Sequence, residues 1–118
     1  MKKRFRAFAY AFSGFYEAFK SETHLQIHIV IAFCVVATGT YFSLTTAEWF
    51  AIGMCITLVV SFELINSAIE KLCDVYSEEE NTKIKYVKDV SAAAVLMVAI
   101  FSAVVGLIVF VPYVTKLV

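Results

Sequence analysis

The sequence predicts an all-α integral membrane protein, with an amphipathic N-terminal surface helix followed by three transmembrane helices. Its 118 residues are 61% hydrophobic, with a mean hydropathy of +0.81, whereas soluble domains contain about 45–50% apolar residues. Charged residues concentrate in the first 22 residues and between Glu63 and Asp89. We expect one membrane-embedded domain over residues 1–118. We expect no cleavable signal, because the first 22 residues lack an uninterrupted apolar segment.

The N-terminal segment, about residues 3–22, combines a basic start with regularly spaced aromatic residues. The aromatic residues recur every three or four positions, at Phe5, Phe8, Phe12, Phe15, Tyr16 and Phe19. The basic residues that lead into them are Lys2, Lys3, Arg4 and Arg6. This pattern is typical of helices that lie in the plane of the membrane interface. We therefore expect this helix to rest on the membrane rather than cross it.

Three segments, about 25–47, 49–71 and 90–113, are long enough to cross a bilayer, which takes about 20 apolar residues. Trp49 and Phe50 begin the second segment, where aromatic side chains can anchor a helix at the interface. Nine of the ten basic residues flank the first segment or lie around the connection between the second and third, and only Lys116 lies beyond the third. Basic residues favour the cytoplasmic side. We therefore expect a plasma-membrane protein whose N-terminus and second connection face the cytoplasm.

A polar stripe marks the second segment. Its members are spaced i, i+3, i+7 and i+11, which places them within an arc of about 80° on a helix: Glu63, Asn66, Glu70 and Asp74. An ionisable group at bilayer depth costs roughly 2.5–3.5 kcal/mol on insertion scales and usually marks a functional site. The alternative, a helix end whose acids face water, suits Asp74 better than Glu63, which lies about 16 Å further along the axis. We therefore expect a site that opens toward the cytoplasm.

The residue types of the stripe suit metal binding and proton transfer. Glu70 and Asn66 are one turn apart, and their oxygens suit a hard cation such as Mg²⁺. Glu63, the deeper acid, suits general-base chemistry on a hydroxyl group. Lys88 could neutralise phosphate charge at the start of the third segment, and Asp89 could cap that helix. These residues by themselves indicate a metal-binding or proton-handling site.

Two histidines, His24 and His28, are spaced to share a helix face in the first segment. Such a pair is weak evidence for a metal. Contacts near the headgroups, or a place on the rim of a site, account for it better. Cys34, Cys55 and Cys73 are widely separated, which favours small packing residues over a metal or redox motif.

Three stretches together resemble the prokaryotic diacylglycerol kinase family: SETHLQIH at 21–28, ELINSAIE at 63–70 followed by Asp74, and KDVSAAAV at 88–95. The resemblance covers nearly the whole chain. The first stretch and the compact C-terminal end look more like the Gram-positive members, which are undecaprenol kinases. His24 departs from the pattern, because those members commonly carry Asn there.

The resemblance implies a homotrimeric membrane kinase that transfers the γ-phosphoryl group of MgATP to a lipid hydroxyl, at a site shared between protomers. It implies that Glu63 is the catalytic base and that Glu22 and Glu70 bind Mg²⁺. Nucleotide, phosphate or other polar site contacts are implied for the remaining matches, which are Tyr10, Asn66, Asp74, Glu79, Lys88 and Asp89. The chain contains no phosphate-binding glycine motif, which agrees with the family pattern.

Several other functions fit parts of the pattern. The lipid acceptor can be undecaprenol or diacylglycerol, because both place a hydroxyl at headgroup depth. A small ion-coupled carrier would also bury Glu63 and Glu70, but such carriers usually show internal repeats, and this chain shows none. A non-enzymatic, pore-forming oligomer would explain the small size. It would not explain why Lys88, Asp89 and the stripe gather on one side.

Overall fold

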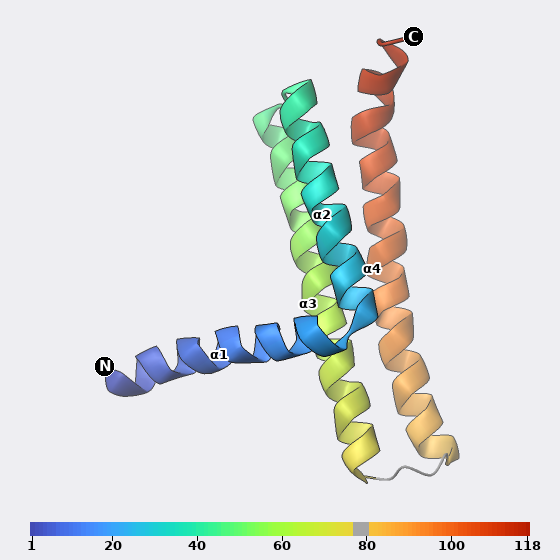
Figure 1. Cartoon of the computed structure of the whole chain (residues 1–118). Helices are drawn as coiled ribbons and strands as arrows, with labels where there is room; N and C mark the ends of the chain where they lie inside the picture. Colours follow the sequence, from blue (N-terminus) through green and yellow to red (C-terminus); the bar gives the residue numbers. More distant parts are fainter. Residues whose placement is uncertain (77–80) are drawn as a thin grey trace.

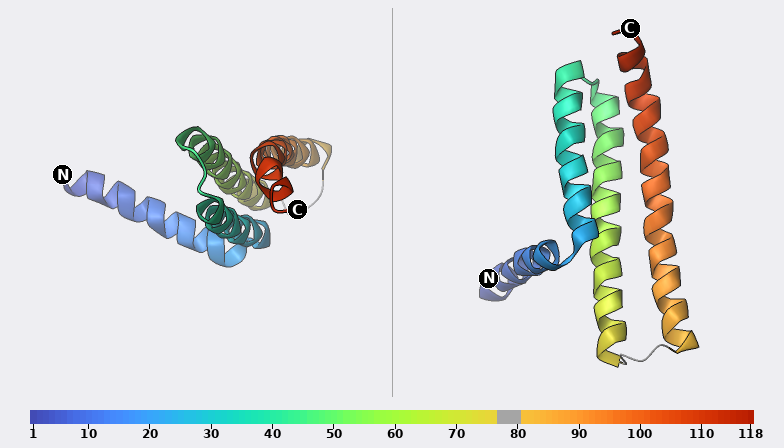
Figure 2. Two further views of the ribbon diagram at one scale, coloured as in Figure 1. Left: turned by 90° about the horizontal axis from the view of Figure 1, so that it is seen from above. Right: turned by 45° about the vertical axis from the view of Figure 1, so that its right-hand side comes forward.

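Four α-helices make up the described parts of the chain, residues 1–76 and 81–118 of a computed structural model: α1 (Lys2–Ser21), α2 (Thr23–Phe42), α3 (Thr46–Tyr76) and α4 (Thr82–Thr115). Helices α2, α3 and α4 run side by side, and α1 leaves them at a steep angle (Figure 1). The two further views show the same arrangement (Figure 2). Helix α3 contacts each of the other three, so it is the centre of the structure.

The helices α2, α3 and α4, of 20, 31 and 34 residues, are long and apolar enough to cross a membrane. Helices α3 and α4 also extend beyond the segments expected from the sequence, to Tyr76 and back to Thr82. A helix can continue into polar sequence because its backbone hydrogen bonds are internal and its charged side chains remain in water. Asp74, the last residue of the polar stripe, therefore lies on the part of α3 that extends beyond the expected segment.

The expectation that Asp89 caps the third transmembrane helix is wrong. The helix begins seven residues earlier, at Thr82, and Asn81 is its N-cap, with Oδ1 accepting a hydrogen bond from the Ile84 backbone N–H at 2.9 Å. The side chain of an N-cap asparagine satisfies an amide of the first turn. Asp89 instead lies within α4, where its carboxylate is free to make side-chain contacts.

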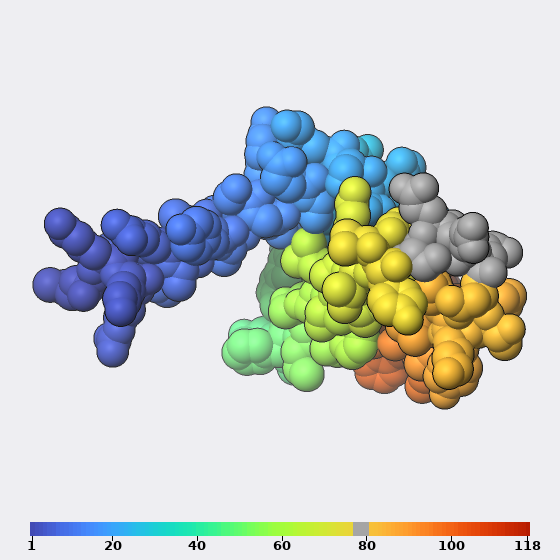
Figure 3. All heavy atoms as spheres, turned by 90° about the horizontal axis from the view of Figure 1, so that it is seen from below, coloured from blue at the N-terminus to red at the C-terminus, as the bar shows by residue number. Residues whose placement is uncertain are grey.

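The junction between α1 and α2 turns at a single residue, Glu22, whose backbone is extended. The Gln26 amide reaches back across the junction and donates to the Phe19 carbonyl at 2.7 Å. Leu25, one turn into α2, is fully buried. These contacts hold the start of α2 against α3, while nearly all of α1 stays exposed and extends away from the body (Figure 3).

The opposite end of the bundle carries the main apolar core. Leu44, Ile52 and Val109 form its buried centre, with Trp49 and Phe110 among the side chains packed around it. The end of α2 packs very closely on the residues that follow it, because a Cβ added at Gly39 would lie 2.8 Å from the Trp49 ring and 2.9 Å from Leu44. Trp49 therefore packs against the protein at this end of the bundle.

Much of the apolar surface of the three long helices remains exposed in the single chain. Phe33 and Met97, in the middle of α2 and α4, are each 73% exposed. Such surfaces are stable against lipid or against other transmembrane helices, but not in water. The chain is accordingly a membrane protein.

Candidate active site

Glu63 lies in the middle of α3 and is the deepest member of the polar stripe. Its residue surface is only 6% exposed, and Ser67, one turn further on, is 8% exposed. The helix carries Glu63 inward because the residue shares a face with Val59, which is also buried. A buried carboxylate needs a polar partner to offset the loss of water.

The partner of Glu63 is His28 on α2. The imidazole Nε2 lies 3.2 Å from Glu63 Oε1, and the two side chains are 26% and 8% exposed. The sequence placed His28 no more closely than the rim of a site, because spacing along one helix does not show which residue faces it from the next. The structure brings this histidine directly to the predicted base.

Asn66 is joined to α4 by a second interhelical contact. The Ser91 hydroxyl donates to Asn66 Oδ1 at 2.7 Å, which leaves the Asn66 amide N–H groups available to other acceptors. The sequence did not single out Ser91 by itself. Its hydrogen bond to a stripe residue is a contact that the sequence did not reveal.

Two ion pairs lie toward the end where α3 finishes and α4 begins. Lys88 Nζ is 2.9 Å from Asp74 Oδ1, and Lys85 Nζ is 2.6 Å from Asp89 Oδ2. Asp74 and Asp89 are both exposed. The structure therefore brings together Asp74 and Lys88, which the sequence had singled out separately. It pairs Asp89 with a lysine on its own helix, four residues earlier.

Glu22 and Glu70, the predicted Mg²⁺ ligands, are both partly buried. Glu22 lines a cavity of about 580 Å³ between α1 and α3, together with Ser67 and Lys71. Carboxylates suit Mg²⁺, which also retains several waters. Within residues 1–76 and 81–118, however, no three acids, cysteines or histidines are grouped closely enough to hold a metal. The two carboxylates are ligands of the type that fits Mg²⁺.

The remaining predicted contacts lie further out. Tyr10 is 73% exposed on α1 and does not line the cavity beside Glu22. Glu79 lies outside the described residues. The site in one chain therefore centres on α2, α3 and the first turns of α4.

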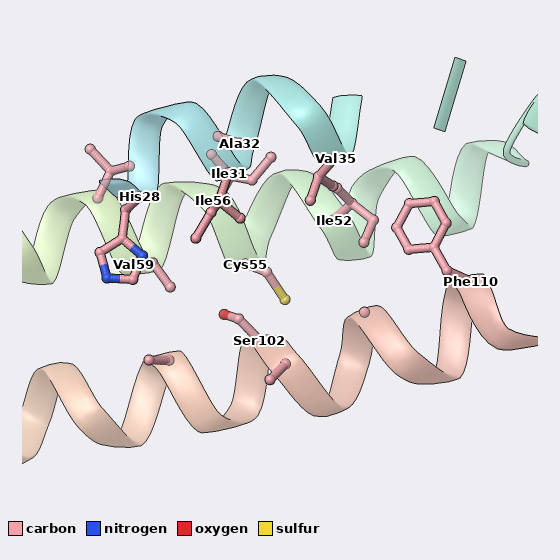
Figure 4. A pocket seen from close by; sticks show the side chains of 14 residues that line it. His28, Ile31, Ala32, Val35, Ile52, Cys55, Ile56, Val59, Ser102 and Phe110 are labelled. Carbon is pink, nitrogen blue, oxygen red and sulfur yellow. The ribbon is translucent and has the colours of Figure 1, made fainter. Parts of the chain in front are cut away.

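A second cavity, of about 300 Å³, extends from the Glu63 region into the apolar part of the bundle. His28 lies at one end and Phe110 at the other, with Ser102 facing Cys55 between them (Figure 4). Helices α2 and α4 both pack on α3. The residues that α4 contributes to the lining include the small Ala103 and Gly106, which leave space among the three helices. Its lining is mostly apolar.

Comparison with known proteins identifies the family of this chain. A model of the family described as prokaryotic diacylglycerol kinase matches residues 9–110. An undecaprenol kinase of Bacillus subtilis is 32% identical over 95% of this chain and 91% of its own length. A diacylglycerol kinase of Helicobacter pylori J99 is 35% identical over 86% of this chain and 80% of its own length. A diacylglycerol kinase of Synechocystis is 29% identical over 85% of this chain and 58% of its own length. The extent of these matches shows that the chain belongs to the prokaryotic diacylglycerol kinase family and is a membrane lipid kinase.

Proposed function

We propose that this lipid kinase transfers the γ-phosphoryl group of MgATP to undecaprenol at the cytoplasmic face of the plasma membrane. The observation that carries the proposal is the buried Glu63 carboxylate, which lies between an apolar cavity and a cluster of polar and charged side chains. The lipid acceptor is dissolved in the membrane, whereas the nucleotide is dissolved in water. A site that joins their two reactive groups must lie at such a boundary.

Glu63 acts as the general base in this proposal. As the acceptor oxygen bonds to the γ-phosphorus, its proton passes to the Glu63 carboxylate. The bond between the γ-phosphorus and the bridging oxygen breaks, and ADP leaves with that electron pair. Phosphoryl transfer depends mainly on positioning and on neutralising charge, so the protein must hold the two substrates in line and exclude water.

The nucleotide is held by the polar side chains nearer the cytoplasm. The Asn66 amide and the Lys88 ammonium serve as donors to phosphate, and Asp74 holds Lys88 in place at 2.9 Å. The remaining nucleotide contacts come from three residues further from Glu63: Asp89, Tyr10 and Glu79. When bound, Mg²⁺ would neutralise phosphate charge, and Glu22 and Glu70 would hold it.

Assembly into a homotrimer would complete this site. Glu22 and Glu70 lack a third acidic ligand within the described part of one chain, and the spans expose apolar surface that helices of other copies can cover. A three-helix bundle also encloses too little space to shield phosphoryl transfer from water. The exposed, basic and aromatic helix α1 would lie on the membrane surface and border the site.

Undecaprenol is the preferred acceptor in this proposal, with diacylglycerol as the second candidate. A relative matched over 95% of this chain and 91% of its own length is named an undecaprenol kinase, and three others are named diacylglycerol kinases. The cavity that starts at His28 would receive the hydrocarbon chain next to the acceptor hydroxyl. Its apolar lining suits either lipid.

The test is a competition between the two lipids. Undecaprenol and diacylglycerol would be presented with MgATP in the same bilayer at equal surface concentration. We expect a higher kcat/KM for undecaprenol. A preference for diacylglycerol would overturn the acceptor assignment, and a lack of magnesium-dependent phosphorylation of either would overturn the proposed reaction.

The orientation has its own test. Single cysteines would replace Thr45, in the turn between α2 and α3, and Asn81, the N-cap of α4, and would be labelled from outside intact cells. The basic residues predict labelling at position 45 and none at position 81. The reverse pattern would contradict a cytoplasmic site, because ATP could not reach it.

A further inference from the structure

The histidine beside the proposed base has a position that the polar stripe does not explain. Among the described residues, the contact that the structure gives the Glu63 carboxylate is with the His28 imidazole, at 3.2 Å. The other paired acids of the site, Asp74 and Asp89, are exposed and contact lysines. Glu63 is therefore the buried acid of the site, and its partner is an imidazole from a different helix.

His28 is held toward α3 by the way α2 begins. Leu25, which lies three residues earlier and on the same helix face, is 0% exposed. The Gln26 amide also ties α2 to the end of α1 at 2.7 Å. These contacts fix the rotation of α2, so that His28 faces α3. His24, one turn closer to the N-terminus, is exposed.

The contact involves one of the two carboxylate oxygens, Oε1. The imidazole Nε2 lies within ion-pair distance of Oε1, at 3.2 Å. Within residues 1–76 and 81–118, Oε2 has no such partner, so it can accept the proton of an alcohol. A polar partner at one oxygen restricts the orientation of the carboxylate without engaging both oxygens as a bidentate cation would.

Resting on the proposed function, we infer that His28 is a positioning residue for Glu63, which aims Oε2 at the lipid hydroxyl. During transfer the proton moves from that hydroxyl to Oε2, while the imidazole stays against Oε1. His28 also lines the apolar cavity at the end next to Glu63. The same side chain thus separates the proton acceptor from the hydrocarbon part of the substrate.

A matched pair of substitutions tests this role. His28→Gln keeps an N–H donor on an unbranched chain, whereas His28→Met is similar in size and has none. We expect His28→Met to lower kcat by about 10–100-fold, since a misaligned reacting group can cost about 10². The KM for MgATP should stay within about twofold. His28→Gln should recover part of the lost kcat, and His24→Met should behave as the unmodified protein.

Combining His28→Met with Glu63→Gln gives a sharper test. If His28 acts through Glu63, its substitution should have little further effect once the carboxylate is gone, because residues that act as a unit are not additive. Each variant is checked for MgATP binding and for the oligomeric state of the unmodified protein. Equal activity of His28→Met and His28→Gln, or a full additional loss in the double variant, would overturn the inference.

These outcomes are distinguishable from failure of the proposed function. If Glu63→Gln retains normal turnover, the base assignment itself is wrong, whatever His28 does. If Glu63→Gln loses turnover and His28→Met does not, only the role of His28 is wrong.

Discussion

Helix α3 carries two glutamates, fifteen positions apart, in contrasting surroundings. Glu48 belongs to the first turn, and its carboxylate accepts hydrogen bonds from the Tyr113 hydroxyl and the Thr45 backbone N–H, while its own backbone N–H donates to Thr45 Oγ1. This reciprocal arrangement is a capping box. Glu63 is more deeply buried and contacts His28 alone among the described residues.

The difference supports a structural role for Glu48 and is the basis for proposing a catalytic role for Glu63. Every contact of Glu48 closes the turn before α3 or ties that turn to α4, so the folded chain explains why an acid is there. Glu63 closes no turn and caps no helix, and its burial costs stability that one imidazole contact only partly offsets. We propose that chemistry is the reason for an acid at this position.

The largest predicted effect distinguishes Glu63 from Glu48. We expect Glu63→Gln to lower kcat by about 10²–10⁴-fold, the range for a general base, with nearly normal MgATP binding and an unchanged or higher thermal stability. The matched variant Glu48→Gln should keep turnover within about twofold and lower Tm instead. Steady-state kinetics and thermal unfolding in one detergent would measure both. Loss of turnover in both variants would contradict the distinction between the two acids.

The next effect concerns the metal. Glu22→Ala and Glu70→Ala should weaken MgATP binding by about 10–100-fold and reduce turnover with it, because each removes a negative ligand facing the cation. Titration of nucleotide at fixed Mg²⁺ would measure the binding. Equal loss of nucleotide affinity in Glu63→Gln would mean that metal binding and proton transfer are not divided in this way.

The same variants test whether the site is shared between copies. Inactive Glu22→Ala protein mixed with inactive Glu63→Gln protein should regain some activity if these residues meet across an interface. Two differently tagged preparations of Glu22→Ala serve as the control. Verified mixed oligomers that remain inactive would place the site within one chain.

A smaller effect is expected in the cavity that leads away from Glu63. A Cβ at Gly106 would meet no atom within 4 Å, so Gly106→Leu should fold while filling cavity space. We expect about a tenfold higher KM for the lipid, since one or a few methylene groups in an apolar pocket change discrimination by about 10–200-fold. Gly53→Leu is the control, because Gly53 is equally open and does not line the cavity. Equal effects of both variants would exclude the cavity as the chain-binding site.

The smallest predicted effect tests the structural role of Glu48. Tyr113→Phe removes the hydroxyl that joins α4 to Glu48 and leaves the ring stacked near Phe42, with centroids 5.5 Å apart. We expect Tm to fall by a few degrees, with kcat and both KM values unchanged. A change in kcat without a change in Tm would show that this end of the bundle takes part in catalysis.

The sequence alone determined the helices, the membrane character and the polar stripe. Long charge-free stretches can bury their backbone in lipid only as helices, and the spacing from Glu63 to Asp74 follows from helical periodicity without any tertiary contact. The family was also recognisable from Glu63–Glu70, Asp74 and Lys88–Asp89, because those residues carry their own pattern.

Only the tertiary structure decided which side chains meet. Periodicity gives the angle of a residue around its own helix, but not the residue facing it from the next helix. For that reason the contacts of Glu63 with His28, Asn66 with Ser91 and Asp74 with Lys88 did not follow from spacing. The wrong expectation for Asp89 has a related cause: a charge-free run marks what lipid can cover, whereas α4 begins where Asn81 caps it.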